Sequence, residues 1–364
     1  MNWIDELKNF FYNDEGKLRN VVYAIGALIV IVSAVVAVVW RIADTRKEPS
    51  ATAQPTTTQA EPSPEPVQAE SFQFNPVTDS IFDIISLQPE NPSLNHTRGE
   101  GYLEQEKYED ALKFFELAAK EYDPNSVECA HTLATMGRTY YCLEKDEQAL
   151  VFLLEAQAIN DNLPEANQRL AAYIYYYFAE IYLDMKNLDE AQKWYFRSLE
   201  CVKTELGKVP PELNTIHVII GAIYLAQVNF SDGLTQFREA YSVSQTDDPF
   251  AEWLKSALET LFPEQDTYFG VVYQQFAAMY GGQENYDECE AFLLGALEFF
   301  EVKLDENRPV IVQCRIALGA LYYIEEKNDE GEAQFQEAYR ISQAEQPYDE
   351  WLDSQLEKYV TPPQ

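Results

Sequence analysis

The chain has 364 residues, with 61 acidic and 26 basic side chains and a formal net charge of −35 at pH 7. Residues 1–47 hold six basic and five acidic groups, which leaves residues 48–364 with a charge of −36. Such a surface repels nucleic acid and anionic lipid headgroups, so this part of the chain is expected to stay soluble or to meet basic partners. The five cysteines lie far apart in the sequence, which argues against a disulfide framework or a zinc centre.

The first two predicted elements concern a membrane. Residues 1–20 are predicted to form an amphipathic tail, because Trp3, Ile4, Leu7 and Phe10 recur at helical spacing. The alternative for this stretch is a disordered tail. Residues 21–40 contain no charged side chain. A helix of this length rises about 30 Å, the thickness of the hydrocarbon core of a bilayer, so the stretch predicts one transmembrane helix.

A linker follows the predicted span. Residues 41–76 are rich in proline and threonine, which predicts an extended or disordered segment that holds the next domain away from the membrane. Three basic residues precede the span and three follow it, so the positive-inside rule does not orient it. The linker favours a cytoplasmic N-terminus and an exported domain, as in a bacterial inner-membrane protein, whereas cysteines without evident partners argue mildly against export.

The next stretches carry a repeated pattern. Residues 77–93 predict a short N-terminal capping segment, and six copies of one pattern follow. Each copy has an aromatic marker, at successive spacings of 38, 42, 42, 56 and 42 residues: Tyr102, Tyr140, Tyr182, Tyr224, Tyr280 and Tyr322. A small residue stands three positions before each marker: Gly99, Gly137, Ala179, Gly221, Ala277 and Gly319. Further small residues stand nine positions after it: Ala111, Ala149, Ala191, Gly233, Cys289 and Gly331.

These positions resemble the tetratricopeptide repeat, and the 42-residue spacing is similar to the longer repeats of kinesin light chains. The resemblance covers roughly residues 94–343. It implies an all-α solenoid of helical hairpins, in which small residues let two helices approach closely and each hairpin needs its neighbours to bury its apolar side. We therefore expect repeats 1–4 over residues 94–244 and repeats 5–6 over residues 269–343.

A second periodicity relates two tryptophan-bearing segments. The stretch Pro249–Leu254 matches Pro347–Leu352 at an offset of 98 residues, and the same offset relates two pairs of markers. The sequence therefore indicates a duplicated unit of two repeats plus one extra helix. One extra helix is expected within residues 245–268, where it bends or interrupts the solenoid, and the other within residues 344–364, where it forms a C-terminal cap.

The resemblance also implies a concave groove lined by the first helix of each hairpin. The family's groove positions, counted from the marker, predict a set of partner-binding side chains: Arg138, Tyr141, Tyr173, Tyr176, Tyr177, Glu180, Gln274, Gln275 and Tyr323. Chaperone-docking members of the family clamp a carboxylate with Lys, Asn and Arg side chains at these positions, and of these only Arg138 is present here. The set favours an apolar peptide held by tyrosine anchors, although the tyrosines of Tyr173–Tyr177 are equally expected to pack between helices.

The sequence predicts no enzyme, no cofactor and no metal site. It has no phosphate-binding loop, no nucleophile elbow and no histidine pair at ligand spacing. The favoured function is a membrane-anchored scaffold that binds a protein or peptide, with a chaperone-like or assembly role. Its architecture, with Phe10, Phe11, Gly16 and Lys17, is similar to ancillary subunits of the bacterial inner-membrane translocon. The alternative is a ligand-sensing or enzyme-accessory subunit, and the oligomeric state stays open.

Overall fold

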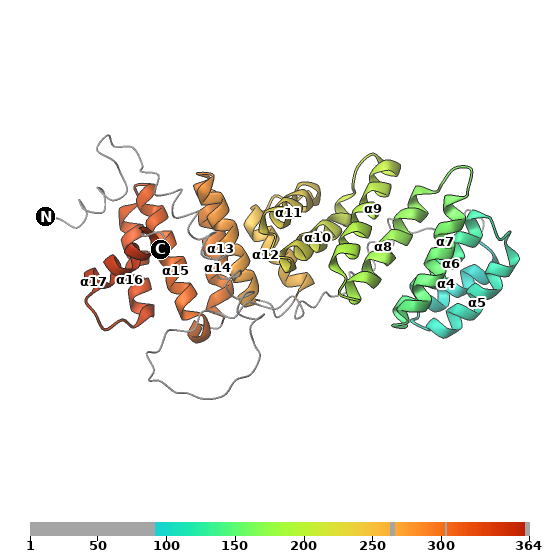
Figure 1. Ribbon diagram of the computed structural model, residues 1–364, viewed down its shortest axis with the longest axis horizontal. Helices are drawn as coiled ribbons and strands as arrows, with labels where there is room; N and C mark the ends of the chain where they lie inside the picture. Colours follow the sequence, from blue (N-terminus) through green and yellow to red (C-terminus); the bar gives the residue numbers. More distant parts are fainter. Residues whose placement is uncertain (1–91, 263–265, 303, 361–364) are drawn as a thin grey trace, which may run out of the picture. The chain divides into compact units, whose positions relative to one another are not determined.

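The computed structural model describes residues 92–262, 266–302 and 304–360 (Figure 1). The predicted tail, span and linker of residues 1–76, and nearly all of the predicted capping segment, lie outside these ranges. No helix within the described ranges is both long and apolar enough to cross a bilayer.

The described residues form helices, and no strand occurs among them. They divide into two compact units on either side of residue 248. In the N-terminal unit, four antiparallel hairpins follow one another: α4 (Leu94–Leu103) with α5 (Tyr108–Glu121), α6 (Val127–Cys142) with α7 (Asp146–Asp161), α8 (Gln168–Asp184) with α9 (Leu188–Leu206), and α10 (Asn214–Ala226) with α11 (Phe230–Ser244). A short 3₁₀ turn, η2 (Pro211–Leu213), leads into α10.

The C-terminal unit begins with a single helix, α12 (Phe250–Leu261). Two hairpins follow it, α13 (Asp266–Gly282) with α14 (Tyr286–Glu301) and α15 (Leu304–Ile324) with α16 (Asn328–Ser342), and α17 (Tyr348–Val360) comes last. Consecutive hairpins within each unit pack on one another, for example α5 on α6 and α14 on α15. The expectation of an all-α stack of helical hairpins is therefore confirmed for the described residues.

The offset of 98 residues reappears in the helix bounds. Helices α8 and α13 are each 17 residues long and start 98 residues apart, and α11 and α16 are each 15 residues long with the same offset. The helices with the tryptophan motif, α12 and α17, also begin 98 residues apart. A duplicated unit of two hairpins and one extra helix is thus visible in the fold, and α12 packs on α14 of the hairpin that follows it.

The small residues before each marker make the close approach possible. A Cβ atom added to Gly99, Gly221 or Gly319 would lie 2.6 Å from a phenylalanine ring on the second helix of the same hairpin. Gly137 meets Leu153 at the same distance. These partner side chains, Phe115, Leu153, Phe237 and Phe335, are all fully buried. Glycine is needed at these positions because the partner side chain occupies the space of a Cβ atom.

The marker tyrosines stack within their own hairpin. Tyr102 and Tyr140 lie 5.2 and 5.1 Å, centroid to centroid, from the phenylalanine twelve positions later. Tyr280 makes the same stacked contact with Phe292 at 5.5 Å. The hydroxyl of Tyr322 donates a hydrogen bond over 2.6 Å to Glu290 of the preceding hairpin. In the three hairpins with a stacked marker, the ring therefore packs against its own second helix, whereas the hydroxyl groups of Tyr224 and Tyr322 bond side chains of the preceding hairpin.

Every hairpin turns in the same way. The residue four positions after each marker adopts a left-handed conformation with φ between 56° and 63°, and none of the six is glycine: Glu106, Glu144, Lys186, Val228, Glu284 and Glu326. The next residue donates its N–H to the carbonyl oxygen of the marker over 2.8 to 3.0 Å. In three hairpins that residue is an asparagine whose side chain caps the second helix.

Candidate functional site

The predicted partner-binding residues fall into two groups, one in each unit. Six of them lie on α6 and α8, the first helices of two consecutive hairpins, which pack against each other. The other three are Gln274 and Gln275 on α13 and Tyr323 on α15, in the C-terminal unit.

Four tyrosines on α6 and α8 form one cluster around Tyr177. The ring of Tyr177 meets those of Tyr141, Tyr173 and Tyr176 at centroid distances of 5.8, 4.9 and 5.4 Å, each in an edge-to-face arrangement. Tyr173, Tyr176 and Tyr177 are only 6%, 2% and 1% exposed. The three rings therefore pack in the interior, which is the alternative that the sequence left open, and their role in partner binding stays a prediction.

Accessible groups surround this buried cluster. Arg138 and Tyr141 on α6 are half-buried, while Cys142 at the end of α6 and Asp184 at the end of α8 are exposed. Arg138 donates a hydrogen bond to Tyr173, and its guanidinium remains charged at any physiological pH. The two helices thus present the cation of Arg138 and, nearer their C-terminal ends, the carboxylate of Asp184, with tyrosine rings between them.

Glu180 is the buried carboxyl group of the cluster, with 5% of its surface exposed. It accepts hydrogen bonds from the hydroxyl of Tyr195 on α9 over 2.5 Å and from that of Tyr141 over 3.4 Å. Burial raises the pKa of Glu180 to about 7, against the lowering effect of hydrogen bonds from Tyr195 and Tyr176. Near neutral pH the carboxyl group is therefore present in both its ionised and its neutral form.

Asp184 lies one turn beyond Glu180. Partial desolvation of its carboxyl group and the nearby negative charges of Asp146 and Glu144 raise the pKa of Asp184, while a hydrogen bond from Tyr141 lowers it. The hydroxyl of Tyr141 therefore has two carboxyl groups within reach, Glu180 and Asp184.

Sequence reasoning missed Tyr195. It stands thirteen positions after its marker, where five of the six hairpins have phenylalanine or leucine. Its ring is fully buried like those side chains, but its hydroxyl reaches Glu180. The signal was available, because hairpin three alone combines a phenol at that apolar position with an acid two positions before the marker.

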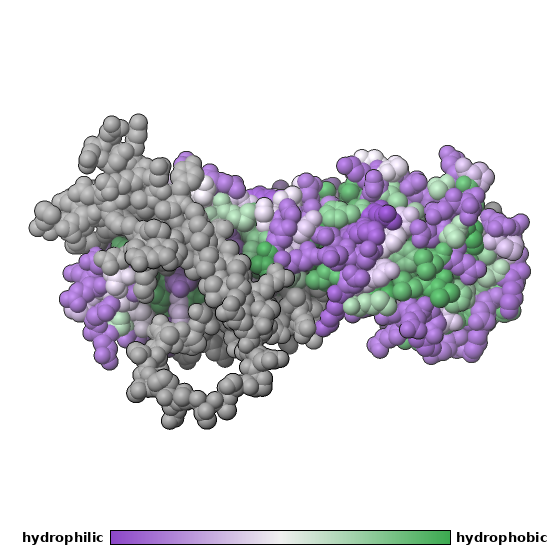
Figure 2. Space-filling view, viewed as in Figure 1, coloured by the Kyte–Doolittle hydropathy of each residue, from purple (hydrophilic) through white to green (hydrophobic). Residues whose placement is uncertain are grey.

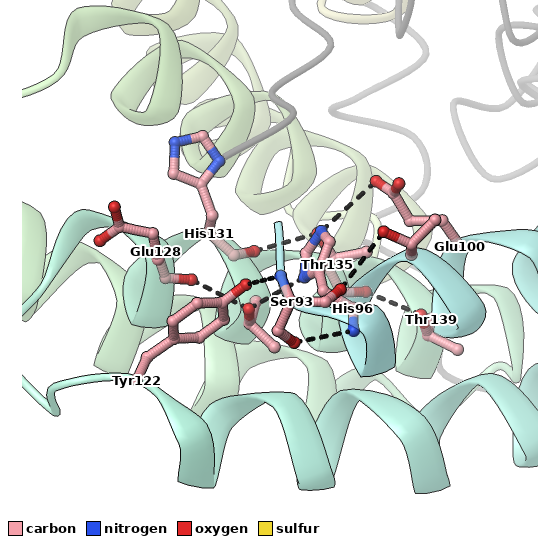
Figure 3. Close-up of polar contacts among 10 residues, drawn as sticks. Ser93, His96, Glu100, Tyr122, Glu128, His131, Thr135 and Thr139 are labelled. Carbon is pink, nitrogen blue, oxygen red and sulfur yellow. Dashed lines mark hydrogen bonds and ion pairs between the residues drawn. The ribbon is translucent and has the colours of Figure 1, made fainter. Parts of the chain in front are cut away.

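A second polar cluster occupies the first two hairpins (Figure 3). His96 on α4 is fully buried, with its Nδ1 3.0 Å from the hydroxyl of Thr132 on α6 and its Nε2 3.4 Å from the carboxylate of Glu100. The hydroxyl of Thr132 donates its proton to the carbonyl oxygen of Glu128, so Nδ1 of His96 is the donor to Thr132. This histidine joins two hairpins as a packing residue.

The residues predicted in the C-terminal unit have separate surroundings. Gln275 is buried. Gln274 forms a hydrogen bond with the thiol of Cys314, and burial raises the pKa of that thiol to about 12. Tyr323 stacks on Phe335 at 5.7 Å, and burial together with the nearby Glu332 raises its pKa to about 12. The structure thus gathers the α6 and α8 residues into one cluster, whereas Gln274, Gln275 and Tyr323 belong to the C-terminal unit and contact residues of that unit.

Two further features bear on the choice of surface. Within the described ranges, no group of three or more His, Cys, Asp or Glu side chains could hold a metal ion. Apolar residues gather where Figure 1 places α6 and α7, as Figure 2 shows. Val151 and Leu154 on α7 are 60% and 55% exposed, which makes them the chief competing surface in the N-terminal unit.

Comparison with known proteins identifies the repeat. The family model of the tetratricopeptide repeat matches residues 269–344, which hold most of α13 and all of α14, α15 and α16. These two hairpins are therefore similar to tetratricopeptide repeats, and the four hairpins of the N-terminal unit share their left-handed turn. No curated protein matches the chain.

Solved structures resemble the chain at low identity. Aspartyl phosphate phosphatase F from Bacillus subtilis is 19% identical over 69% of this chain and 70% of its own, with a TM-score of 0.38. The apo form of RapI is 11% identical over 68% and 97%, with a TM-score of 0.39. YrrB, described as a tetratricopeptide repeat protein with an unusual peptide-binding site, is 15% identical over 64% and 93%, with a TM-score of 0.32. At such scores these likenesses identify no shared function.

Proposed function

We propose that this chain, which carries tetratricopeptide repeats, is a scaffold that binds a protein or peptide partner, and that α6 and α8 provide the binding surface. The observation that supports this surface is the gathering of Arg138, Tyr141, Cys142 and Asp184 on adjacent first helices of two hairpins. Charged and phenolic side chains over a tyrosine cluster can recognise both the backbone and the side chains of a peptide. The strongly acidic composition favours a partner with basic residues.

Crosslinking from Cys142 tests this surface. A photoactivatable maleimide is attached to Cys142 in the full chain with Cys201, the other partly accessible thiol, replaced by serine. A matched variant carries Cys142→Ser and Val151→Cys, which moves the probe to the competing apolar surface. We expect a discrete crosslinked polypeptide from position 142, reduced by Arg138→Ala, and little product from position 151. Equal products from both positions, or product from position 151 alone, would overturn the assignment.

We also propose that residues 21–40 anchor the scaffold in a membrane with the repeats on the exported side, where an assembly or chaperone-like role would follow. The support is the uncharged stretch of twenty residues and the linker behind it. Extraction of native membranes with alkaline carbonate tests the anchor, because an integral protein stays in the pellet. Protease added to intact cells or spheroplasts tests the side. Digestion of the repeats only after lysis would overturn the exported orientation.

A further inference from the structure

The carboxyl group of Glu180 connects three helices. Tyr141 on α6 and Tyr195 on α9 bond its two oxygens, and Tyr176 on α8 adds a third hydroxyl. The two long-range contacts differ in length, with 2.5 Å to Tyr195 and 3.4 Å to Tyr141. The contact with Tyr141 is therefore the weaker one, and it belongs to the residue that the proposed binding surface exposes.

The number of protons available decides how these groups can bond. An ionised Glu180 accepts a hydrogen bond from every surrounding phenol. A neutral Glu180 carries a proton of its own, which needs an acceptor. Tyr141 can serve as that acceptor, because its own hydroxyl proton can turn to Asp184. Among the contacts described, Tyr195 has no second carboxylate to which its proton could turn.

The charged and titratable groups around this site come from four elements. They are Arg138, Tyr141 and Cys142 from α6, Glu144 and Asp146 from the turn and the start of α7, Tyr173, Tyr176, Tyr177 and Asp184 from α8, and Tyr195 from α9. The tyrosines in this set that face Glu180 have pKa values raised by burial, so they stay neutral around pH 7. Glu180 is the buried member of the set whose pKa, about 7, lies in that range.

We propose that Glu180 is a proton-sensing positioning residue: its protonation state decides whether the Tyr141 hydroxyl donates to Glu180 or to Asp184. When Glu180 is ionised, Tyr141 donates inwards to it. When Glu180 takes up a proton, that proton is donated to Tyr141, whose own proton then goes to Asp184. The orientation of a half-buried groove tyrosine thereby follows the proton concentration. This inference rests on the proposed function in one respect, because the proposed function supplies the partner that Tyr141 would contact.

A fluorine label on Tyr141 tests the inference without any partner. The full chain is prepared with 3-fluorotyrosine at position 141, and its ¹⁹F shift is followed from about pH 5.5 to about pH 8.5. We expect one titration with a midpoint near 7, the pKa of Glu180. Burial raises the pKa of Tyr141 itself, so its own ionisation does not enter this range. The titration should disappear in Glu180→Gln. A flat shift in the unmodified chain, or an unchanged titration in Glu180→Gln, would overturn the proposal.

Two further samples make the result specific. Fluorotyrosine at Tyr102, which is half-buried and stacked on Phe114 in the first hairpin, should show no such titration. Asp184→Ala removes the second acceptor at an exposed position, so it should shrink the shift change at Tyr141 without unfolding the chain. An undiminished change in Asp184→Ala would contradict the switch. Since no partner is present, failure here leaves the crosslinking result of the proposed function untouched, and the reverse also holds.

Discussion

Replacing Gly99 by alanine tests whether the close approach within a hairpin requires glycine. The new Cβ atom would lie 2.6 Å from Cε1 and 2.7 Å from Cδ1 of Phe115. The ring cannot easily move away, because Phe115 is fully buried and packs against the ring of His96 at 5.5 Å. Overpacking of this kind costs about 1–3 kcal/mol. The better helix propensity of alanine offsets about 1 kcal/mol of this cost, so the free energy of unfolding is expected to fall by about 0–2 kcal/mol.

Gly101 in the same helix supplies the matched control. A Cβ atom added there meets nothing within 4 Å, so Gly101→Ala should stabilise α4 by about 0.5–1 kcal/mol. Hairpins at the end of a repeat array can open separately, so hydrogen exchange of the α4 and α5 amides, read by mass spectrometry, is the appropriate assay. We expect faster exchange in Gly99→Ala and slower exchange in Gly101→Ala. Greater protection in Gly99→Ala than in the unmodified chain, or protection equal to that in Gly101→Ala, would refute the steric argument.

Three other changes have defined outcomes. Val228→Gly relieves a β-branched residue at φ 60° and should stabilise the chain by about 1 kcal/mol in urea denaturation, whereas Val151→Gly, a helical position of similar exposure, should destabilise it by about the same amount. Glu180 binds its proton more tightly when folded, because its pKa rises from 4.5 to about 7. The free energy of unfolding therefore falls as pH rises through this window. Between pH 5 and pH 8 the contribution of Glu180 to this fall is up to about 3 kcal/mol, and thermal melts at the two pH values should show that Glu180→Gln removes it. Thr132→Val removes the acceptor of the buried histidine of α4 and should cost about 1–3 kcal/mol, more than Thr139→Val, whose hydroxyl bonds its own helix.

The hairpins could be predicted from the sequence because their information is local and repeated. A small residue three positions before an aromatic marker recurs six times, and each copy specifies the contact of one helix with the next. The offset of 98 residues also relates the starts of four of the five corresponding helix pairs, whereas α15 starts 90 residues after α10 and has 21 residues instead of 13. The turns were less readable. A left-handed residue is usually glycine or asparagine, but here glutamate, lysine and valine adopt that conformation.

The cluster around Glu180 could be predicted only in part. Family groove positions pointed to Glu180, Tyr141 and Tyr177, and these residues do lie together. Whether a ring at such a position faces a partner or fills the interior depends on the neighbouring hairpins, which single positions in a sequence do not encode. Tyr195 was missed because its position reads as apolar packing, and its hydroxyl contact exists only once α8 and α9 are in place.

The two tryptophan-bearing helices show how one sequence was adapted to two surroundings. In α12, Phe250 packs edge-to-face on Phe292 at 5.7 Å, and the carbonyl oxygen of Ala251 accepts a hydrogen bond from Tyr273 over 2.7 Å. This side of α12 is covered by the hairpin of α13 and α14. The residue of α17 that corresponds to Ala251 is Asp349, which is exposed.

Lys255 of α12 also differs from its counterpart in α17. It forms an ion pair with Glu298 on α14, and its counterpart in α17 is the exposed Asp353. Both copies keep a ring stacked on the tryptophan, with Phe250 on Trp253 at 6.3 Å and Tyr348 on Trp351 at 6.4 Å. The two copies of the helix therefore keep this ring pair and differ on the side that, in α12, meets the following hairpin. An aspartate at position 251 would place a charge beneath Tyr273, whereas at position 349 the same charge stays in water. The distribution of these few charges, more than the tryptophan motif itself, distinguishes the surroundings of α12 from those of α17.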